Sequence, residues 1–416
     1  MGFIVPTMVA LLAGAGALYV NTISGFGRLP GQHMKDMTST EMIRRYDAYY
    51  GNATEWLGEL PPHDEANNAA AVERYFTLTT DFFEYGWGDA IHMAPLKPDW
   101  SFKRSIAYWE QYFVSQMGLK KGMKVADLGM GIGGPMRRII EYTGAFVTGV
   151  TICDHQIQRA KTITKESHSA FVQERATYLR GDYNDLPKEM KPSSFDAAYF
   201  LESLSHSEDR ASPLAQAANI VKPGGIVAAW QWMLKPAFNY SNPRHLELKR
   251  GMEYGGGLRN LIKPYGEDGD DLGIHTAGSE FRHDEFKRAG LEVLESYDMG
   301  SEAIERGFLG WWVALTTGID LPSRLTSSHY GRKLTMGIVR VLEAVGIAEP
   351  GTYRTALMLE HCGLSAALSG QMGIFTPAWL TIGRVPLDKD DAEQAKRIAD
   401  LQANIALALK KREASA

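Results

Sequence analysis

Short apolar runs alternate with helix-like segments between Gly122 and about Trp232. Five of these runs are predicted to be strands, and they span residues 125–128, 145–150, 176–180, 195–200 and 226–232. Strands that alternate with helices form parallel βαβ units, so this pattern predicts a doubly wound α/β domain. Pro223-Gly224-Gly225 is a turn signal that ends a helix just before the fifth run.

The two ends of the chain follow other patterns. Residues Phe3 to Val20 are almost wholly apolar, and no charged side chain precedes Arg28. This stretch favours an uncleaved membrane anchor over residues 1–27, although it lies near the short end of the ~17 to 25 residues that a spanning helix needs. A cleaved signal peptide would normally carry a basic first segment, which is missing, and a buried helix is the remaining alternative.

Polar, mixed segments surround the predicted α/β domain. Residues 28–100 are expected to form a connector and substrate cap, with a helical run from Asp64 to Thr79. The last residues, 387–416, have apolar side chains at helical spacing and many charges, so they predict an amphipathic helical tail.

Composition narrows the classes of partner. The net charge is -5 with a pI near 6.2, and there is no long Lys/Arg block, so nucleic acid is not an expected partner. The two cysteines, Cys153 and Cys362, lie far apart without a Cys/His cluster. They therefore indicate neither a disulfide framework nor a metal site, and a reducing compartment that faces the cytosol fits best.

A glycine-rich loop follows the first predicted strand and opens a helix. It reads Asp127-Leu128-Gly129-Met130-Gly131-Ile132-Gly133-Gly134-Pro135. Its glycine spacing differs from the G-x-G-x-x-G of dinucleotide folds, and an acid precedes it. Such an acid would repel a pyrophosphate but can pair with the ammonium of a methionine moiety. Asp127, Gly129, Gly131 and Gly133 are therefore predicted to bind S-adenosyl-L-methionine.

The ends of two further strands supply candidate cofactor contacts. After the third strand, Asp182 offers an acceptor for the adenine amino group and Tyr183 an aromatic face. After the second strand, Thr151 and Gln156 are predicted to hydrogen-bond the cofactor. A helix N-cap at Asp154 explains that last segment about equally well.

Segments spread over most of the chain resemble the sterol 24-C-methyltransferases, a family of class I S-adenosylmethionine-dependent enzymes. The upstream matches are Phe83-Glu84-Tyr85-Gly86-Trp87-Gly88 with His92, Gly133-Gly134-Pro135, and Phe200-Leu201-Glu202-Ser203-Leu204-Ser205-His206. The downstream matches are Tyr330-Gly331-Arg332, Pro350-Gly351-Thr352 and Phe375-Thr376-Pro377, in what resembles the family's C-terminal domain. The chain departs from the family pattern at Phe83, Met130 and His155, where Tyr, Cys and Tyr are usual.

The resemblance implies a fold and a reaction. The fold would be a seven-stranded Rossmann-like methyltransferase core over residues 101–300, with an α-rich cap and a sterol methyltransferase C-terminal domain over 301–386. The reaction would move a methyl group from S-adenosyl-L-methionine to a side-chain alkene carbon of the C24 type in a sterol. It would pass through a carbocation and release an alkylated sterol and S-adenosyl-L-homocysteine, with no metal.

Other acceptors and one class of protein outside the enzymes remain open. Cycloartenol, lanosterol, zymosterol and a methylene sterol are alternatives within the sterols, and squalene or another triterpene lies just outside them. The segment from Gly149 to Gln156 also resembles methyltransferases that act on tocopherol precursors or unsaturated fatty acyl chains. The third hypothesis is a lipid-binding scaffold that retains a methyltransferase shell, and it predicts no cofactor binding.

The resemblance also assigns roles to individual residues. A carbocation is stabilised by aromatic faces and carboxylates in a dry site. Candidate catalytic residues are Glu84, Tyr85, His92, Glu202, His206 and Asp298, in which the histidines would accept a proton. Candidate substrate contacts are Phe83, Trp87, Trp311 and Trp312, although Trp87 could be core, and Trp311 and Trp312 would equally suit a dimer interface or the core. Association with a membrane is expected, on the cytosolic face of the endoplasmic reticulum in a eukaryote, and a homo-oligomer is an open alternative.

Overall fold

The computed structural model describes residues 68–207, 209–258 and 279–388, with a few isolated positions beyond residue 388. The predicted anchor over 1–27, the connector up to residue 67 and most of the tail over 387–416 lie outside these ranges. None of the helices within the described ranges combines the length and the apolar character that crossing a membrane requires.

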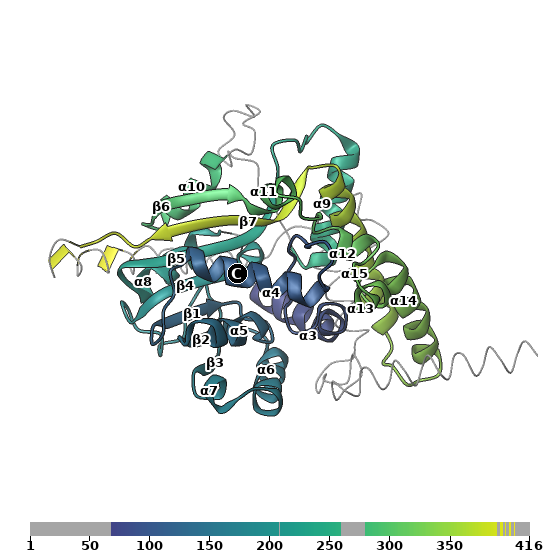
Figure 1. Cartoon of the computed structure of the whole chain (residues 1–416), viewed down its shortest axis with the longest axis horizontal. Helices are drawn as coiled ribbons and strands as arrows, with labels where there is room; N and C mark the ends of the chain where they lie inside the picture. Colours follow the sequence, from purple (N-terminus) through teal and green to yellow (C-terminus); the bar gives the residue numbers. More distant parts are fainter. Residues whose placement is uncertain are drawn as a thin grey trace, which may run out of the picture.

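A seven-stranded sheet with the order β3-β2-β1-β4-β5-β7-β6 forms the centre of the molecule (Figure 1). Its first five strands are β1 (Lys124–Leu128), β2 (Phe146–Thr151), β3 (Ala176–Arg180), β4 (Phe195–Leu201) and β5 (Val221–Leu234). They pair in parallel, which confirms the strands predicted from the apolar runs and the doubly wound fold.

The last two strands come from regions where the apolar pattern located none. Strand β6 (Glu292–Asp298) and strand β7 (Phe375–Arg384) pair with each other in an antiparallel manner, and β7 also pairs antiparallel with β5. Strand β7 therefore lies inside the sheet, between β5 and β6. The C-terminal segment over 301–386 thus contributes a strand to the same sheet as the methyltransferase core.

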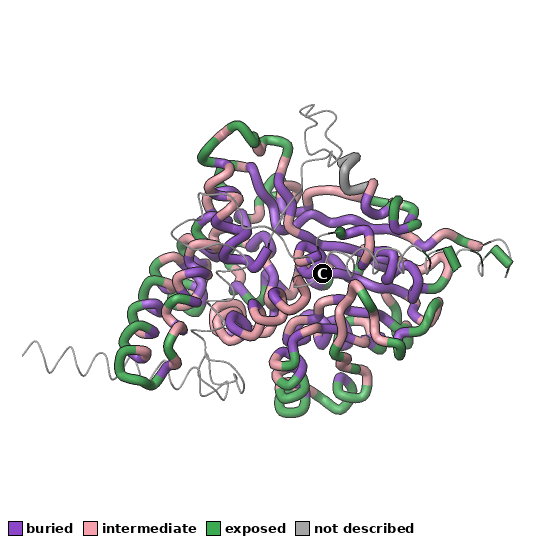
Figure 2. Tube along the Cα trace, turned by 180° about the vertical axis from the view of Figure 1, so that it is seen from behind, coloured by how far each residue is buried: buried purple, intermediate pink, exposed green. Residues whose placement is uncertain are grey.

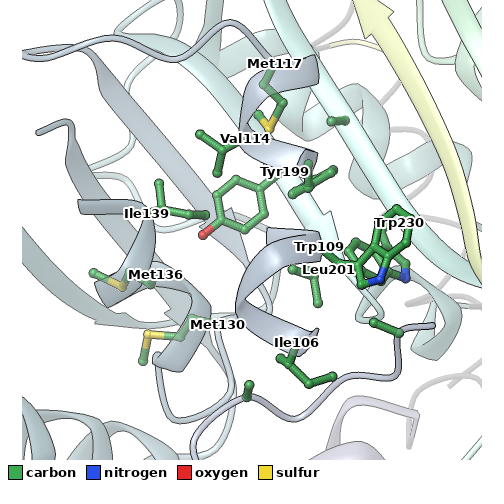
Figure 3. Packing of buried hydrophobic residues seen from close by; sticks show 14 of the residues in the cluster. Ile106, Trp109, Val114, Met117, Met130, Met136, Ile139, Tyr199, Leu201 and Trp230 are labelled. Carbon is green, nitrogen blue, oxygen red and sulfur yellow. The ribbon is translucent and has the colours of Figure 1, made fainter. Parts of the chain in front are cut away.

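Helices cover both faces of the sheet because alternate strand residues are apolar on opposite faces. One face packs on α4 (Phe102–Gln116), α5 (Gly134–Thr143) and α6 (Asp154–Ser167), and the other on α8 (Ala211–Ile220) and α10 (Ser279–Arg288). The strands are mostly buried (Figure 2). On the α4 side, Tyr199 lies among Val114, Met117 and Ile139 (Figure 3). The remaining short helices of this half are α7 (Ala170–Gln173) and the 3₁₀ turn η2 (Leu204–His206).

A helical compartment stands beside the sheet (Figure 1). It consists of α3 (Asn68–Trp87), α9 (Pro243–Gly256), α12 (Val313–Thr316), α13 (Leu321–Leu325), α14 (His329–Ala344) and α15 (Thr352–Gln371), and α11 (Met299–Glu305) follows β6. Helix α15 packs on α3, α9 and α14. The Tyr75 hydroxyl donates to the Gly255 carbonyl at 3.1 Å, which ties α3 to the end of α9.

The first described helix is longer at its end than the sequence pattern predicted. The predicted helical run ended at Thr79, whereas α3 continues to Trp87 and stops where Gly88 adopts a positive φ of 75°. Glycine takes this left-handed conformation without a steric penalty. The aromatic block over residues 83–88 therefore lies in the last turns of α3, and its final residue, Gly88, ends the helix.

Candidate active site

A single cavity of about 220 Å³ joins the glycine-rich loop to the helical compartment. It opens at the carboxyl ends of β1 and β4, where the strand order reverses and ligands of doubly wound sheets bind. Among the predicted site residues, its lining contains Phe83, Tyr85, Trp87, His92, Gly129, Gly131, Thr151, Gln156, Asp182, Tyr183, Glu202 and His206. The topology thus brings most of the predicted cofactor and substrate residues to one place.

The glycines of the loop serve different purposes. Gly129, Gly131 and Gly133 all have positive φ, at 98°, 55° and 75°. A Cβ on Gly129 would come within 2.2 Å of the Ser203 Cβ, so this glycine allows the loop to pack on the strand β4 turn. A Cβ on Gly131 would have only Ile91 within 4 Å, at 3.9 Å, so Gly131 faces open space in the cavity. Gly133 caps α5 and is not part of the lining formed by the described residues.

A buried ionic network holds the loop after α3 against helix α5. The carboxylate of Asp89 pairs with Arg137 at 3.0 Å and Arg138 at 2.9 Å, and Arg138 also pairs with Glu110. Close approach is possible because Gly134 has no side chain: a Cβ there would lie 1.9 Å from the Asp89 carbonyl oxygen. Arg138 and Arg137 hold the pKa of Asp89 well below its usual range, even though burial opposes this.

The carboxylate of Asp127 is buried at the end of β1, next to the glycine loop. Burial raises its pKa to about 7, the hydroxyl of Tyr199 lowers it through a hydrogen bond, and the charge of Glu110 raises it. The Tyr199 hydroxyl donates to Asp127 Oδ2 at 2.7 Å. A small pocket lined by Asp127, Gly129 and Gly131 adjoins this carboxylate. The site therefore presents, beside Gly131, a carboxyl group whose pKa lies near neutral pH.

Polar side chains at the ends of β2 and β3 complete the cofactor end of the cavity. Thr151 donates to Gln156 Oε1 at 2.7 Å, and the Gln156 amide donates to Thr80 at 3.2 Å, so these groups fix one another. Helix α6 begins at Asp154 with Cys153 as its N-cap, so Asp154 is not the capping residue. The Tyr183 hydroxyl donates to the Ser203 carbonyl at 2.9 Å. The Asp182 carboxylate accepts two 2.8 Å hydrogen bonds from Asn184, which also lines the cavity.

Glu202 lies between the cofactor end and the helical compartment. It is one of the few non-glycine residues in the described chain with a positive φ, 52°, a strained conformation that is found at functional sites. Its carboxyl accepts from the Met93 amide at 2.6 Å and from the Trp232 indole at 2.7 Å. Desolvation raises the pKa of Glu202 to about 8, and these two hydrogen bonds act against it. The Glu202 carboxyl group therefore changes its protonation state close to neutral pH.

The two predicted histidines differ in their surroundings. Burial lowers the pKa of His206 to about 4, so this ring is neutral at pH 7, and its edge packs on Phe76 with the ring centroids 4.9 Å apart. Its Nδ1 lies 3.2 Å from the Gly257 carbonyl oxygen, which only accepts, so Nδ1 carries the proton and Nε2 a lone pair. His92 instead pairs with Glu110 through Nε2 at 2.9 Å, and its buried Nδ1 has no hydrogen-bond partner in the described part of the chain.

Other predicted residues lie outside the lining that the described residues form. Glu84 makes a two-point ion pair with Arg159 of α6, at 2.6 and 2.7 Å, which joins α3 to α6. Asp298 caps α11 and pairs with Lys235 at 2.9 Å. Trp311 and Trp312 pack edge to face with ring centroids 5.7 Å apart, and Trp311 is buried in a core cluster. These four residues therefore make contacts with other parts of the fold and do not line the cavity formed by the described residues, and the roles that the resemblance suggests for them stay predictions.

Comparison with known proteins assigns the family. A model of the sterol methyltransferase C-terminal domain matches residues 323–387, and a methyltransferase domain model matches residues 126–229. The sterol 24-C-methyltransferase of Aspergillus fumigatus is 31% identical over 369 residues, which are 87% of this chain and 92% of that protein. This chain belongs to the sterol 24-C-methyltransferase family. It is an S-adenosylmethionine-dependent methyltransferase.

A plant relative supports the same family, and two solved structures share the fold. The cycloartenol-C-24-methyltransferase of Arabidopsis thaliana is 29% identical and covers 84% of this chain and 95% of its own. A mycolic acid cyclopropane synthase structure has a TM-score of 0.55 at 14% identity, and it covers 79% of this chain and 100% of its own. A cyclopropane synthase from Mycobacterium tuberculosis has a TM-score of 0.52 at 16% identity, with coverages of 79% and 100%. These structures share the fold of this family member.

Several residues of the site were not predicted. Tyr199, which binds Asp127, stands opposite it in the β1–β4 register, and that pairing of predicted strands could have indicated the contact. Trp232 and Met93, which hold Glu202, come from β5 and from the loop after α3. Arg332 of α14 also lines the cavity. No local pattern in the sequence places Trp232, Met93 or Arg332 beside the glycine loop or the cavity.

Proposed function

We propose that this enzyme transfers a methyl group from S-adenosyl-L-methionine to a side-chain alkene carbon of the C24 type in a sterol. The observation that carries the proposal is the single cavity that runs from the glycine loop into the helical compartment. Its far part is lined mainly by apolar and aromatic side chains of α3, α14 and α15: Phe76, Phe82, Phe83, Met336, Ala356, Leu359 and Ala366. Such walls exclude water from a lipid alkene while its end reaches the loop.

The residues at the cofactor end fit S-adenosyl-L-methionine. When bound, this cofactor supplies an electrophilic methyl group. The open space at Gly131 would admit its methionine part, and the Asp127 carboxylate would pair with its ammonium. Asp182 and Tyr183 would hold the adenosine part, with Thr151 and Gln156 beside them.

The remaining lining residues suit a substrate that becomes positively charged. As the bond between the methyl group and sulfur breaks and S-adenosyl-L-homocysteine is released, a carbon–carbon bond forms at one alkene carbon. The neighbouring carbon is left with positive charge, and the later loss of a proton restores a double bond. Glu202 provides a carboxylate whose charge is favoured once a cation is next to it, because a nearby positive charge lowers a raised carboxyl pKa. Tyr85 and Trp87 provide aromatic faces toward the same cavity. His206 Nε2 is a neutral acceptor for the proton.

The decisive experiment is incubation of the purified full-length protein in micelles with labelled S-adenosyl-L-methionine. The acceptors are cycloartenol, lanosterol, zymosterol, a methylene sterol and squalene, and products are read by mass. A gain of one methylene unit on a sterol supports the proposal and names the acceptor. Saturable binding of S-adenosyl-L-homocysteine without any sterol product would contradict it and favour another lipid acceptor.

We also propose that the protein works at a membrane surface and docks through the outer face of α14. Apolar side chains recur there at helical spacing with large exposed fractions, Tyr330 80%, Leu334 54% and Val341 47%, and the C-cap Val345 continues them at 63%. The cations Lys333 and Arg340 are exposed on the same helix. An apolar stripe with basic side chains beside it suits an anionic lipid surface, which is also where a sterol is available.

Vesicle flotation tests this docking face. The full-length protein should float with vesicles that contain anionic lipid, and Leu334→Glu with Val341→Glu should weaken flotation. Leu294→Glu, at an exposed apolar residue of β6, is the matched control and should leave flotation unchanged. Equal flotation of all variants would contradict the proposal. A stable dimer that the α14 changes dissociate, without any change in flotation, would assign the face to a second copy instead.

A further inference from the structure

The cavity has a second polar end, distant in the fold from the glycine loop. Arg332 and Thr335 of α14 line it together with Thr326, Tyr85 and Gly363. Thr335 Oγ1 is shared between the Gly331 carbonyl at 3.0 Å and the Tyr85 hydroxyl at 3.5 Å. The surrounding lining from α14 and α15 is apolar, so polar groups are concentrated in this one corner of the far compartment.

The guanidinium of Arg332 is held rigidly but incompletely satisfied. Its Nε pairs with Glu360 of α15, and its Nη1 donates to the Leu315 carbonyl at 2.8 Å and to the Ser327 carbonyl. Its buried Nη2 has no hydrogen-bond partner within residues 68–207, 209–258 and 279–388. Buried donors without partners are unfavourable, so this N–H group is a candidate for a ligand atom.

The space beside Nη2 is preserved by a glycine. A Cβ on Gly363 would lie 3.1 Å from Arg332 Cζ and 3.3 Å from Nη2, tighter than ordinary contact, and both residues line the cavity. Glu360 pairs with Arg332 through Nε, and the same carboxylate lies 2.9 Å from His329 Nδ1 and 3.7 Å from Lys333 Nζ. Nη2 itself faces a compartment whose other walls are mainly apolar, which suits a neutral hydrogen-bond acceptor on a lipid.

We infer that Arg332 Nη2 donates a hydrogen bond to the ring hydroxyl oxygen of the sterol and so sets the orientation of the substrate. This inference rests on the proposed function. A sterol carries its hydroxyl group on the ring system, at the opposite end from the side-chain alkene. When the alkene lies next to the glycine loop, the hydroxyl group lies at the far end of the cavity, where Arg332 is.

The wild-type enzyme tests the inference first. The sterol accepted in the panel above is compared with its deoxy analogue, which lacks only the ring hydroxyl group. A hydrogen bond from a charged donor should favour the hydroxylated sterol by about tenfold to a hundredfold in kcat/KM. Equal kcat/KM for the two substrates overturns the inference and leaves the proposed function intact, whereas the absence of any sterol product removes the proposed function itself.

Two variants connect this preference to the guanidinium. Arg332→Met combined with Glu360→Met removes the donor without leaving a buried carboxylate unpaired. Gly363→Ala leaves the arginine in place but crowds Nη2. Either change should reduce the preference for the hydroxylated sterol to about threefold or less, while the affinity for S-adenosyl-L-homocysteine stays the same.

Lys333→Met is the matched control, because Lys333 is adjacent on α14, lies 3.7 Å from Glu360 and is not part of the lining formed by the described residues. It should keep the full preference. If the double variant folds and keeps the full preference, the inference is overturned. If the double variant does not fold, the same outcome in Gly363→Ala overturns it. Loss of the preference in Lys333→Met as well would assign it to the charge around Glu360 and also overturns it.

Discussion

The hydrogen bond from Tyr199 to Asp127 should tune how strongly the cofactor binds at neutral pH. Tyr199→Phe removes the hydroxyl that lies 2.7 Å from Asp127 Oδ2 and changes little of the ring packing on β4. The bond stabilises the ionised carboxylate and opposes the effect of burial, which raises the pKa of Asp127 to about 7. Its loss should raise that pKa further and leave more of the acid neutral.

The size of the effect follows from the strength of the bond. A hydrogen bond to a charged group contributes about 1.5–3 kcal/mol, and one pKa unit corresponds to about 1.4 kcal/mol, so the pKa of Asp127 should rise by roughly one to two units. At about pH 7.5 the ionised fraction, and with it the affinity for the cofactor's ammonium, should fall roughly threefold to twenty-fivefold. The difference should shrink as the pH rises, because the variant carboxyl then ionises as well.

Calorimetric titration with S-adenosyl-L-homocysteine between about pH 6 and 8.5 measures this directly. The affinity of the wild-type enzyme should increase through about pH 7, and the midpoint in Tyr199→Phe should lie at higher pH. Tyr183→Phe is the control, since its hydroxyl donates to a backbone carbonyl, and its midpoint should not move. An unchanged midpoint in Tyr199→Phe would refute the pairing of Asp127 with the ammonium.

Three further outcomes test the site. Glu202→Gln leaves one carbonyl oxygen for two donors, the Met93 amide and the Trp232 indole, and removes the negative charge. Turnover measurements should show kcat lower by about 10²-fold, and calorimetry should show an unchanged cofactor affinity. Gly129→Ala should lower Tm because its Cβ would meet Ser203. Gly131→Ala has room for its Cβ, so it should change Tm by only a few degrees but should weaken cofactor binding. Equal losses of Tm in the two variants would contradict this. Asp298→Asn keeps Oδ1, which caps α11 and accepts from Thr376, and loses at Oδ2 the acceptor for Lys235 and for the Ser301 hydroxyl. Turnover per folded molecule should stay unchanged, and a large loss would support a catalytic role.

Local pattern was sufficient to predict the parallel part of the sheet. Strands β1, β2, β4 and β5 contain apolar runs that are largely buried, and β3 at the edge was recognised by its place in the alternation of strands and helices. Strand β6 has no fully buried residue and few apolar ones, and β7 follows two long helices instead of one crossover helix. Their place in the sheet depends on antiparallel pairing between segments far apart in the chain.

The residues of the candidate site also fall into two groups: those whose position follows from a predicted strand, and those whose position depends on contacts distant in the sequence. Glu202, His206 and the glycine loop directly follow predicted strands, and the carboxyl ends of neighbouring parallel strands meet at one edge of the sheet. Glu84 was chosen from the aromatic block that resembles the family, and Asp298 as a further source of negative charge. Their contacts are with Arg159 and Lys235, which lie far away in the sequence. Whether a carboxylate faces a cavity or an arginine is decided by tertiary packing, which a single sequence does not display.

The position of β7 limits how this enzyme can be shortened or recombined. Helices α12 to α15 follow β6 and precede β7, so this part of the helical compartment is an insertion between two strands that pair with each other. A chain cut after residue 300 would expose the inner edges of β5 and β6, which would favour aggregation. A chimera that takes α12 to α15 from another relative should therefore keep both β6 and β7 and join the new helices between them.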